Sequence, residues 1–346
     1  MGFQPASGSL TYQTGASFVA AAQFLNTSSL IAPLVAPIVA STTREGYFVT
    51  FSPGPELDHV DSKRADGATY KRLNGKVGTT TFACVSRGVE HAIPRAKSRQ
   101  WDPVLRGRLL DRYGAEAALK VRKDVEKEVA DTLFNTTTYT SGNGNSHAAS
   151  NQWDTSTGTP ATDVATAKSS IADRFDGVDD SDFFAVIPAA LARKTFLNTQ
   201  LRTGLGAAFT REGVSPASMP IPMLAEALAE ALGVGKVFIP NAGYRSGGTD
   251  AAPTLTKYWN PFYCGVGLLP KVETTDGGIA LWRGVGVIPA WTEMVPVVEG
   301  DGQPVPISVV TYEENQTGSE VVQVDTYTDL KIVHQNAFYL ITACDS

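Results

Sequence analysis

Charged residues are absent from the start of the chain. None of the first 43 residues is Asp, Glu, Lys or Arg, and the first charge is Arg44. A secretory signal starts with basic residues, so we do not expect one here. Residues 16–40 are apolar on average, but polar residues and two prolines interrupt them, which disfavours a transmembrane helix. We therefore predict that residues 1–45 form an apolar arm that lies against a protein surface.

Basic residues are also scarce. Lys and Arg total 29 against 35 Asp and Glu, which gives a formal net charge of −6. A coat that wraps nucleic acid tightly needs clustered basic side chains to neutralise phosphates. Any contact with DNA is therefore expected to be weak and non-specific.

Cysteine is rare. The three cysteines, Cys84, Cys264 and Cys344, are odd in number and widely separated. This spacing predicts neither a disulfide framework nor a cysteine metal site, and it fits a reducing compartment.

Catalytic signatures are missing as well. The chain has no G-x-S-x-G motif, no P-loop and no G-x-G-x-x-G motif, because GVGLLP and GVGVIP lack the third glycine. His147 has the most loop-like setting of the four histidines, but a solvated or hydrogen-bonded role is favoured over that of a base. We predict no catalytic residue, no cofactor and no enzyme; a hydrolytic enzyme is the disfavoured alternative.

An aspartate cluster between residues 173 and 182 is the place to look for a metal. Its candidate ligands are Asp176, Asp179 and Asp180, although their spacing does not match an EF-hand. Aspartate side chains commonly stabilise turns by bonding nearby backbone N–H groups. A solvated helix-to-strand loop is therefore the favoured interpretation, with calcium at a subunit contact as the alternative.

The first half of the chain predicts a long hairpin and a long helix. Residues 46–53 and 78–93 are rich in β-branched and aromatic residues, which predicts paired strands around a polar tip. Residues 114–134 carry apolar side chains every four positions, with opposite charges at i,i+4 on the other faces. This helix is therefore predicted to pack along one side only.

The second half predicts an α/β region and then strands. Helical patterns near 161–175, 188–200 and 220–232 alternate with apolar runs at 182–188 and 236–240. After residue 253 the chain becomes β-rich, with two extended runs between 303 and 333 and a last buried strand at 337–342. The fold class is therefore α+β.

In this order, the segments resemble the Hong Kong 97-type fold of tailed-bacteriophage major capsid proteins. IAPLVAPIVASTTREGYFVTF is similar to the arm that enters the family's extended loop, and LKVRKDVEKEVADTLFN is similar to its spine helix. NQWDTSTGTPATDVATAKSSI resembles the start of the axial domain, and EVVQVDTYTDLKIVHQNAFYLITA resembles the closing strands. The similarity covers nearly the whole chain.

The resemblance implies a domain plan and contact residues. The plan is an N-terminal arm (1–45), an extended β-hairpin loop (46–96), a peripheral domain with the spine helix (97–150 and 295–334) and an axial α/β domain (151–294 and 335–346). The arm is expected to contact neighbouring subunits through Leu30, Ile31, Leu34 and Ile38. The loop tip is expected to do so through Asp61, Lys63, Arg64, Asp66, Lys71 and Arg72.

The implied function is that of a capsid subunit. Hexamers and pentamers would form an icosahedral shell around double-stranded DNA, assembled in the host bacterial cytoplasm and ending in the virion. The family's charged N-terminal scaffolding segment has no counterpart before Arg44, so either a separate scaffolding protein exists or the sequence is already the mature form, and Met1 favours the first alternative. The other expected partners are the portal and a possible decoration protein. The alternative is an encapsulin-like nanocompartment shell, which shares the fold.

Overall fold

The structure is a computed structural model of the whole chain. It describes residues 30–51, 77–98, 100, 103–175, 177–195, 198–201, 219–246, 254–275, 278–292, 298–300, 303–305 and 307–345.

The longest element is helix α5, Pro103–Leu133, whose 31 residues span about 46 Å. It begins eleven residues before the start predicted from the sequence. Proline is favoured in the first turn of a helix, whereas Gly107 and Gly114 weaken the helical pattern inside it. The predicted apolar stripe is confirmed, because Ala117, Val121, Val125 and Val129 are all buried, together with Leu133.

One side of α5 packs on a six-stranded sheet. Its strands are β1 (Ile38–Ser41), β4 (Val85–Pro94), β13 (Gly286–Trp291), β16 (Ser308–Glu314), β17 (Ser319–Thr328) and β18 (Lys331–Ile332). Strand β17 lies between β16 and β4 and is antiparallel to both. Its alternating Val322, Val324 and Thr326 are fully buried, as the sequence pattern predicts for a half-buried strand.

The extended loop is built differently from the predicted two-stranded ribbon. Residues 78–93 do not form one strand, because β3 (Val77–Ala83) ends before the buried Cys84 and β4 begins after it. Only β3 pairs with β2 (Glu45–Phe51). Strands β11 (Lys271–Thr275) and β12 (Gly278–Arg283) complete a four-stranded sheet in the order β11-β12-β2-β3. Because an isolated hairpin is marginally stable in water, the two added strands support the loop.

The molecule has two main cores. One lies between α5 and the six-stranded sheet. The other surrounds a five-stranded sheet with the order β5-β19-β10-β6-β7. The strands are β5 (Ser146–Ala148), β6 (Phe183–Val186), β7 (Lys236–Phe238), β10 (Cys264–Leu268) and β19 (Phe338–Thr342). The helices α6 (Pro160–Ala172), α7 (Ala189–Thr195) and α9 (Ile221–Leu232) contribute buried side chains to the same core. The predicted α/β region is thus confirmed.

Two glycines of β10 leave space for aromatic rings in this core. A Cβ on Gly265 would lie 2.3 Å from the Phe338 ring, and one on Gly267 would lie 2.7 Å from the Phe184 ring. The GVG spacing therefore serves side-chain packing.

The remaining elements are short. They are α2 (Ala32–Val35), α4 (Arg95–Ser98), the hairpin of β8 (Gly243–Ser246) with β9 (Thr254–Lys257), the hairpin of β14 (Val298–Gly300) with β15 (Gln303–Val305), and 3₁₀ turns at Ser141–Asn143, Asp180–Asp182 and Gln335–Ala337.

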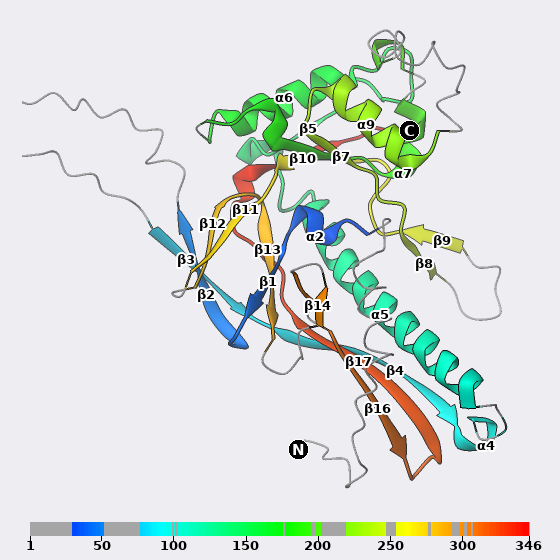
Figure 1. Cartoon of the computed structure of the whole chain (residues 1–346). Helices are drawn as coiled ribbons and strands as arrows, with labels where there is room; N and C mark the ends of the chain where they lie inside the picture. The colour runs from blue at the N-terminus through cyan, green and yellow to red at the C-terminus, as the bar shows by residue number, and fades with distance from the viewer. Residues whose placement is uncertain are drawn as a thin grey trace, which may run out of the picture.

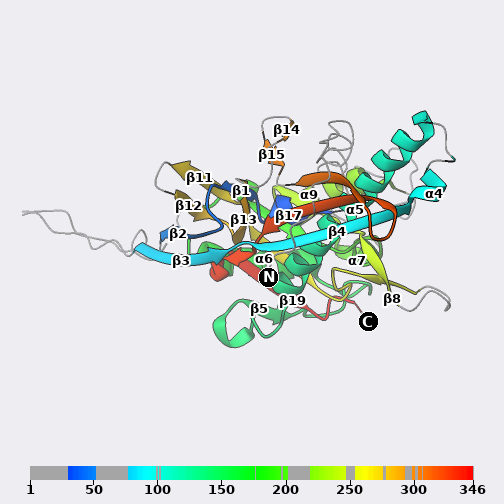
Figure 2. The same cartoon turned by 90° about the horizontal axis from the view of Figure 1, so that it is seen from below.

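These elements give an elongated molecule. In Figure 1, α5 runs diagonally away from the five-stranded sheet and its helices, while β2 and β3 extend to the opposite side. Figure 2 shows β3 and β4 following one line along most of the molecule. The strands depart from the predicted domain plan at two places. Strands β11 to β13 lie outside the five-stranded sheet, whereas β5, placed in the peripheral range, belongs to it.

Candidate assembly surfaces

The described arm is anchored on its own chain by a buried carboxylate. Glu126 on α5 has no exposed surface. Its Oε1 accepts hydrogen bonds from the backbone N–H of Ile31 at 3.1 Å and from Trp259 Nε1 at 2.6 Å. Its Oε2 accepts one from the N–H of Ala32 at 2.7 Å. The carboxylate thus binds N–H groups at the start of α2 that have no helical partner.

Burial dominates the electrostatics of this anchor. Burial raises the pKa of Glu126, while the hydrogen bonds from Trp259, Ala32 and Ile31 and the nearby Arg122 oppose that rise. Burial also lowers the pKa of Arg122 to about 10, with Glu126 opposing the change. The sequence predicted an exposed i,i+4 pair here, but Arg122 is only 4% exposed, so this interpretation is wrong.

The four predicted arm residues have different surroundings. Leu30 and Ile31 are each 3% exposed and lie in the chain's own interior, so as described they face no neighbour. The reason is that Glu126 holds the arm against α5, and β1 then pairs in parallel with β13. Ile38 is partly buried beside the same core. Leu34 is 53% exposed, and among these four it alone presents a largely open apolar side chain.

The loop tip and one metal candidate lie outside the described residues. This applies to Asp61, Lys63, Arg64, Asp66, Lys71 and Arg72, and to Asp176. Below the tip, Phe48 and Phe82 join β2 to β3 with ring centroids 4.9 Å apart, and Tyr47 is 56% exposed.

The other two metal candidates make a turn. Asp179 forms a capping box with Asp182, and Asp180 pairs with Lys168 at 2.8 Å. Asp182 also pairs with Arg283 on β12. No group of three or more metal-ligating side chains is found in the part of the chain that the structure describes. Within the described residues, Asp179, Asp180 and Asp182 thus form a capped turn that leads into β6.

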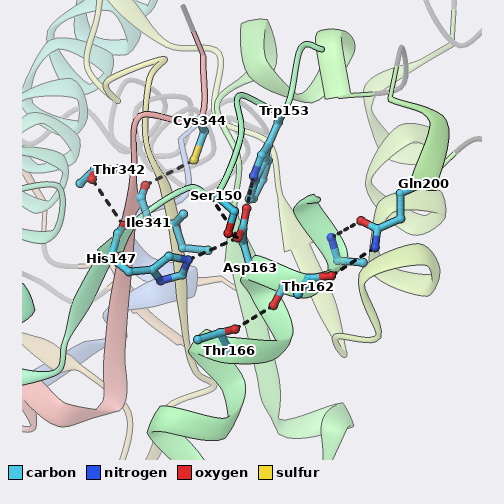
Figure 3. Close-up of polar contacts among 11 residues, drawn as sticks. His147, Ser150, Trp153, Thr162, Asp163, Thr166, Gln200, Ile341, Thr342 and Cys344 are labelled. Carbon is cyan, nitrogen blue, oxygen red and sulfur yellow. Dashed lines mark hydrogen bonds and ion pairs between the residues drawn. The ribbon is translucent and has the colours of Figure 1, made fainter. Parts of the chain in front are cut away.

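His147 takes part in a hydrogen-bonded network around Asp163 (Figure 3). Its Nε2 lies 3.6 Å from Asp163 Oδ1, which also accepts the Ser150 hydroxyl at 3.1 Å. Trp153 Nε1 donates to Asp163 Oδ2 at 2.8 Å. Burial alone would raise the pKa of Asp163, but the nearby His147 and the hydrogen bonds from Trp153 and Ser150 hold it below its usual value.

The geometry of this network fits a role in holding the fold together. Ser150 donates to the aspartate and not to His147, so the arrangement lacks the nucleophile-to-base hydrogen bond that acyl transfer needs. Asp163 instead joins α6 to the loop that follows β5.

The exposed side of α5 borders two hollows. One, of about 340 Å³, is lined by ion pairs: Arg87 on β4 bonds Asp124 at 2.5 Å and Glu128 at 2.6 Å. The other, called the basic groove below, has about 580 Å³ and lies between α5 and the β8–β9 hairpin. Local sequence patterns do not reveal either hollow, because one forms only when α5 packs beside β4 and the other only when it lies beside the β8–β9 hairpin.

Comparison with solved structures identifies the architecture. A phage-related protein from Bordetella bronchiseptica is 17% identical, with a TM-score of 0.66 over 97% of this chain and 99% of that chain. The capsid of the cyanophage P-SCSP1u gives 11% identity and a TM-score of 0.51 over 92% of this chain and 89% of that chain. The mature capsid of bacteriophage PhiM1 gives 8% identity and a TM-score of 0.51 over 99% and 92%.

The fold is that of phage capsid proteins. It matches the Hong Kong 97-type fold expected from the sequence, at the level of an α+β capsid architecture. No family model matches the chain, and no curated protein is significantly similar in sequence. Within the described residues, no helix is long and apolar enough to cross a membrane.

Proposed function

We propose that this chain is the major capsid protein of a tailed bacteriophage. Copies of it assemble into hexamers and pentamers, which close into an icosahedral shell around double-stranded DNA. It is a structural subunit that catalyses no reaction. The observation that carries the proposal is the capsid-protein fold, which extends over nearly the whole length of the chain.

The shape of the chain supports the proposal. The four-stranded sheet that includes β2 and β3 extends away from both main cores (Figure 1). Exposed apolar side chains lie on or beside it, namely Tyr47 at 56% and Val85 at 56%. Large apolar side chains left open on extended elements are typical of surfaces that are covered in an assembly.

We propose two sets of contacts between subunits. In the arm, Leu34 is the apolar side chain that meets a neighbour, while Leu30 and Ile31 hold the arm in place. At the loop tip, mixed charges from Asp61 to Arg72 pair with complementary charges on an adjacent subunit. The further partners are a portal, a separate scaffolding protein and a possible decoration protein.

Electron microscopy of the expressed chain, alone and with its neighbouring genes, tests the function. We expect closed particles, or sheets and tubes of hexamers, in negative stain. A monodisperse small oligomer under every condition would contradict a shell role. Small closed particles that hold a cellular enzyme would instead support the nanocompartment alternative.

A pair of arm variants tests the contact. Leu34→Glu places a charge where we propose an apolar contact, so closed particles should be lost while the secondary structure is kept. Thr42→Glu adds the same charge at another exposed position of the arm and should leave assembly intact. If the Leu34→Glu variant forms normal particles, Leu34 is not part of the contact between subunits.

A further inference from the structure

One wall of the basic groove is a row of lysines on α5. Lys120, Lys123 and Lys127 line it, and their spacing of three and four residues places them on one face of the helix. The side chains of Lys120 and Lys127 are 48% and 45% exposed. This face carries no buried core side chain, because the apolar stripe of α5 points to the sheet.

The opposite wall is aromatic and apolar. Tyr244 on β8 stacks on Tyr258, with ring centroids 5.5 Å apart and an interplanar angle of 24°. Leu255 on β9 is 58% exposed and Tyr244 is 39% exposed. Figure 1 shows this hairpin beside α5. The base of the hairpin is closed by Lys257 Nζ, which donates to Asn241 O at 2.9 Å and to Asn241 Oδ1 at 2.7 Å.

The groove has an excess of positive charge. Arg245 adds a fourth cation to the three lysines, against Asp124 as the carboxylate among the lining residues. Asp124 is already bonded to Arg87, outside the groove, at 2.5 Å. Lys120 and Lys127 pair with Glu116 and Asp131 at i,i+4, and such exposed pairs exchange for new partners at little cost.

We infer that the basic groove binds an acidic segment of a separate protein, one whose carboxylates meet the lysines and whose apolar side chains cover Leu255 and Tyr244. Tyrosine and arginine, here Tyr244 and Arg245, are enriched at protein interfaces, and the lysines supply charge that complements an acidic partner. A DNA duplex offers phosphates to the lysines, but its backbone presents mainly charged phosphate and polar sugar to Leu255, so the two walls together favour a protein segment.

Binding of a model peptide tests this inference without requiring a shell. The probe is a fluorescein-labelled amphipathic peptide made of Glu and Leu, titrated with the full-length chain and followed by fluorescence anisotropy. Two further peptides replace its Glu by Gln or its Leu by Ser, and a labelled duplex oligonucleotide supplies the phosphate alternative. Since the readout is peptide affinity and not particle formation, this inference and the proposed shell function fail separately.

Matched variants connect binding to the groove. Lys120→Gln, Lys123→Gln and Lys127→Gln are combined, and the control combines Lys97→Gln, Lys236→Gln and Lys271→Gln, which remove the same charge from exposed positions elsewhere. Leu255→Ser is compared with Met223→Ser, another exposed apolar residue, 46% exposed, on α9.

The groove triple variant should weaken binding of the Glu/Leu peptide at least about tenfold, and Leu255→Ser about threefold. Both controls should stay within about twofold of the unmodified chain, and the Gln and Ser peptides should bind more weakly than the probe. Equal affinity in the groove and control variants would overturn the inference.

Two further outcomes would also overturn it. Tight duplex binding that depends on the lysines but not on Leu255 would make the groove a phosphate surface. Loss of self-association in the triple variant, without any peptide binding, would assign the groove to a second copy of the chain.

Discussion

The N–H groups of Ile31 and Ala32 sit at the start of α2, where a helix leaves such donors without internal partners. Glu126 accepts both, together with the indole N–H of Trp259. The residue therefore joins three distant parts of the sequence. From the sequence alone, Glu126 resembles any other glutamate on a charged helix, because its partners come from segments 94 and 133 positions away.

Removing this carboxylate should loosen the arm. Glu126→Ala leaves three buried donors unbonded and Arg122 without its nearby countercharge, so we expect the free energy of unfolding to fall by about 3 kcal/mol. Chemical denaturation measures this. The control Glu116→Ala removes an exposed glutamate and should cost less than about 1 kcal/mol. Equal losses of unfolding free energy in the two variants would show that Glu126 stabilises the fold no more than an exposed glutamate does.

Asp163 gives a pH-dependent prediction. Its folded pKa lies below the usual value near 3.9, so the folded state binds fewer protons than the unfolded state. The contribution of Asp163 to the free energy of unfolding is therefore complete above about pH 4, and it is lost as the pH falls through the lower folded pKa. Asp163→Asn should cost about 2 kcal/mol at pH 7, and this difference should shrink below about pH 4.

Denaturation of Asp163→Asn and of the unmodified chain across this pH range provides the measurement. Asp131→Asn, which alters an exposed carboxylate on α5, is the control and should have a small effect at every pH. A stability difference for Asp163→Asn that does not change with pH would show that the charge of Asp163 is not what stabilises the network.

At the scale of elements, local patterns predicted the types of helices and strands better than their partners. The stripe on α5, the strands β6, β7 and β19, and the β16–β17 hairpin follow from periodicity within single segments. The parallel pairing of β12 with β2 joins Ile279 to Phe48, and nothing in either segment signals the other. At Cys84 the chain leaves one sheet and enters another, and this break cannot be predicted from the local sequence for the same reason.

Strand β10 offers a packing test at this scale. Gly265→Ala would place a methyl group 2.3 Å from the Phe338 ring and 3.0 Å from the Phe134 ring. Overpacking of this kind should cost about 1–3 kcal/mol. Thermal unfolding measures it, with Gly142→Ala as the control, because a Cβ there meets only Thr140 Oγ1 at 3.9 Å. An unchanged midpoint for Gly265→Ala would mean that the rings move aside freely.

At the scale of the whole molecule, the elongated outline is what distinguishes this chain from a compact enzyme domain. A further cluster of buried side chains joins the two main cores, because Val129 and Leu133 of α5 pack with residues of the five-stranded sheet such as Phe338. Strands β3 and β4 nevertheless run along most of the length of the molecule (Figure 2). The order of elements made the capsid fold predictable from the sequence. The contact surfaces were less predictable, because whether Leu30 or Leu34 faces outward depends on how Glu126 holds the arm.

The most direct test of the shell role is a cryo-electron microscopy reconstruction of particles assembled from the full-length chain, expressed alone and with its neighbouring genes. We predict closed icosahedral shells of hexamers and pentamers, with this fold in every subunit and Leu34 covered by a neighbouring copy. Failure to form particles under every assembly condition, or a closed oligomer too small to enclose a genome, would contradict the shell role.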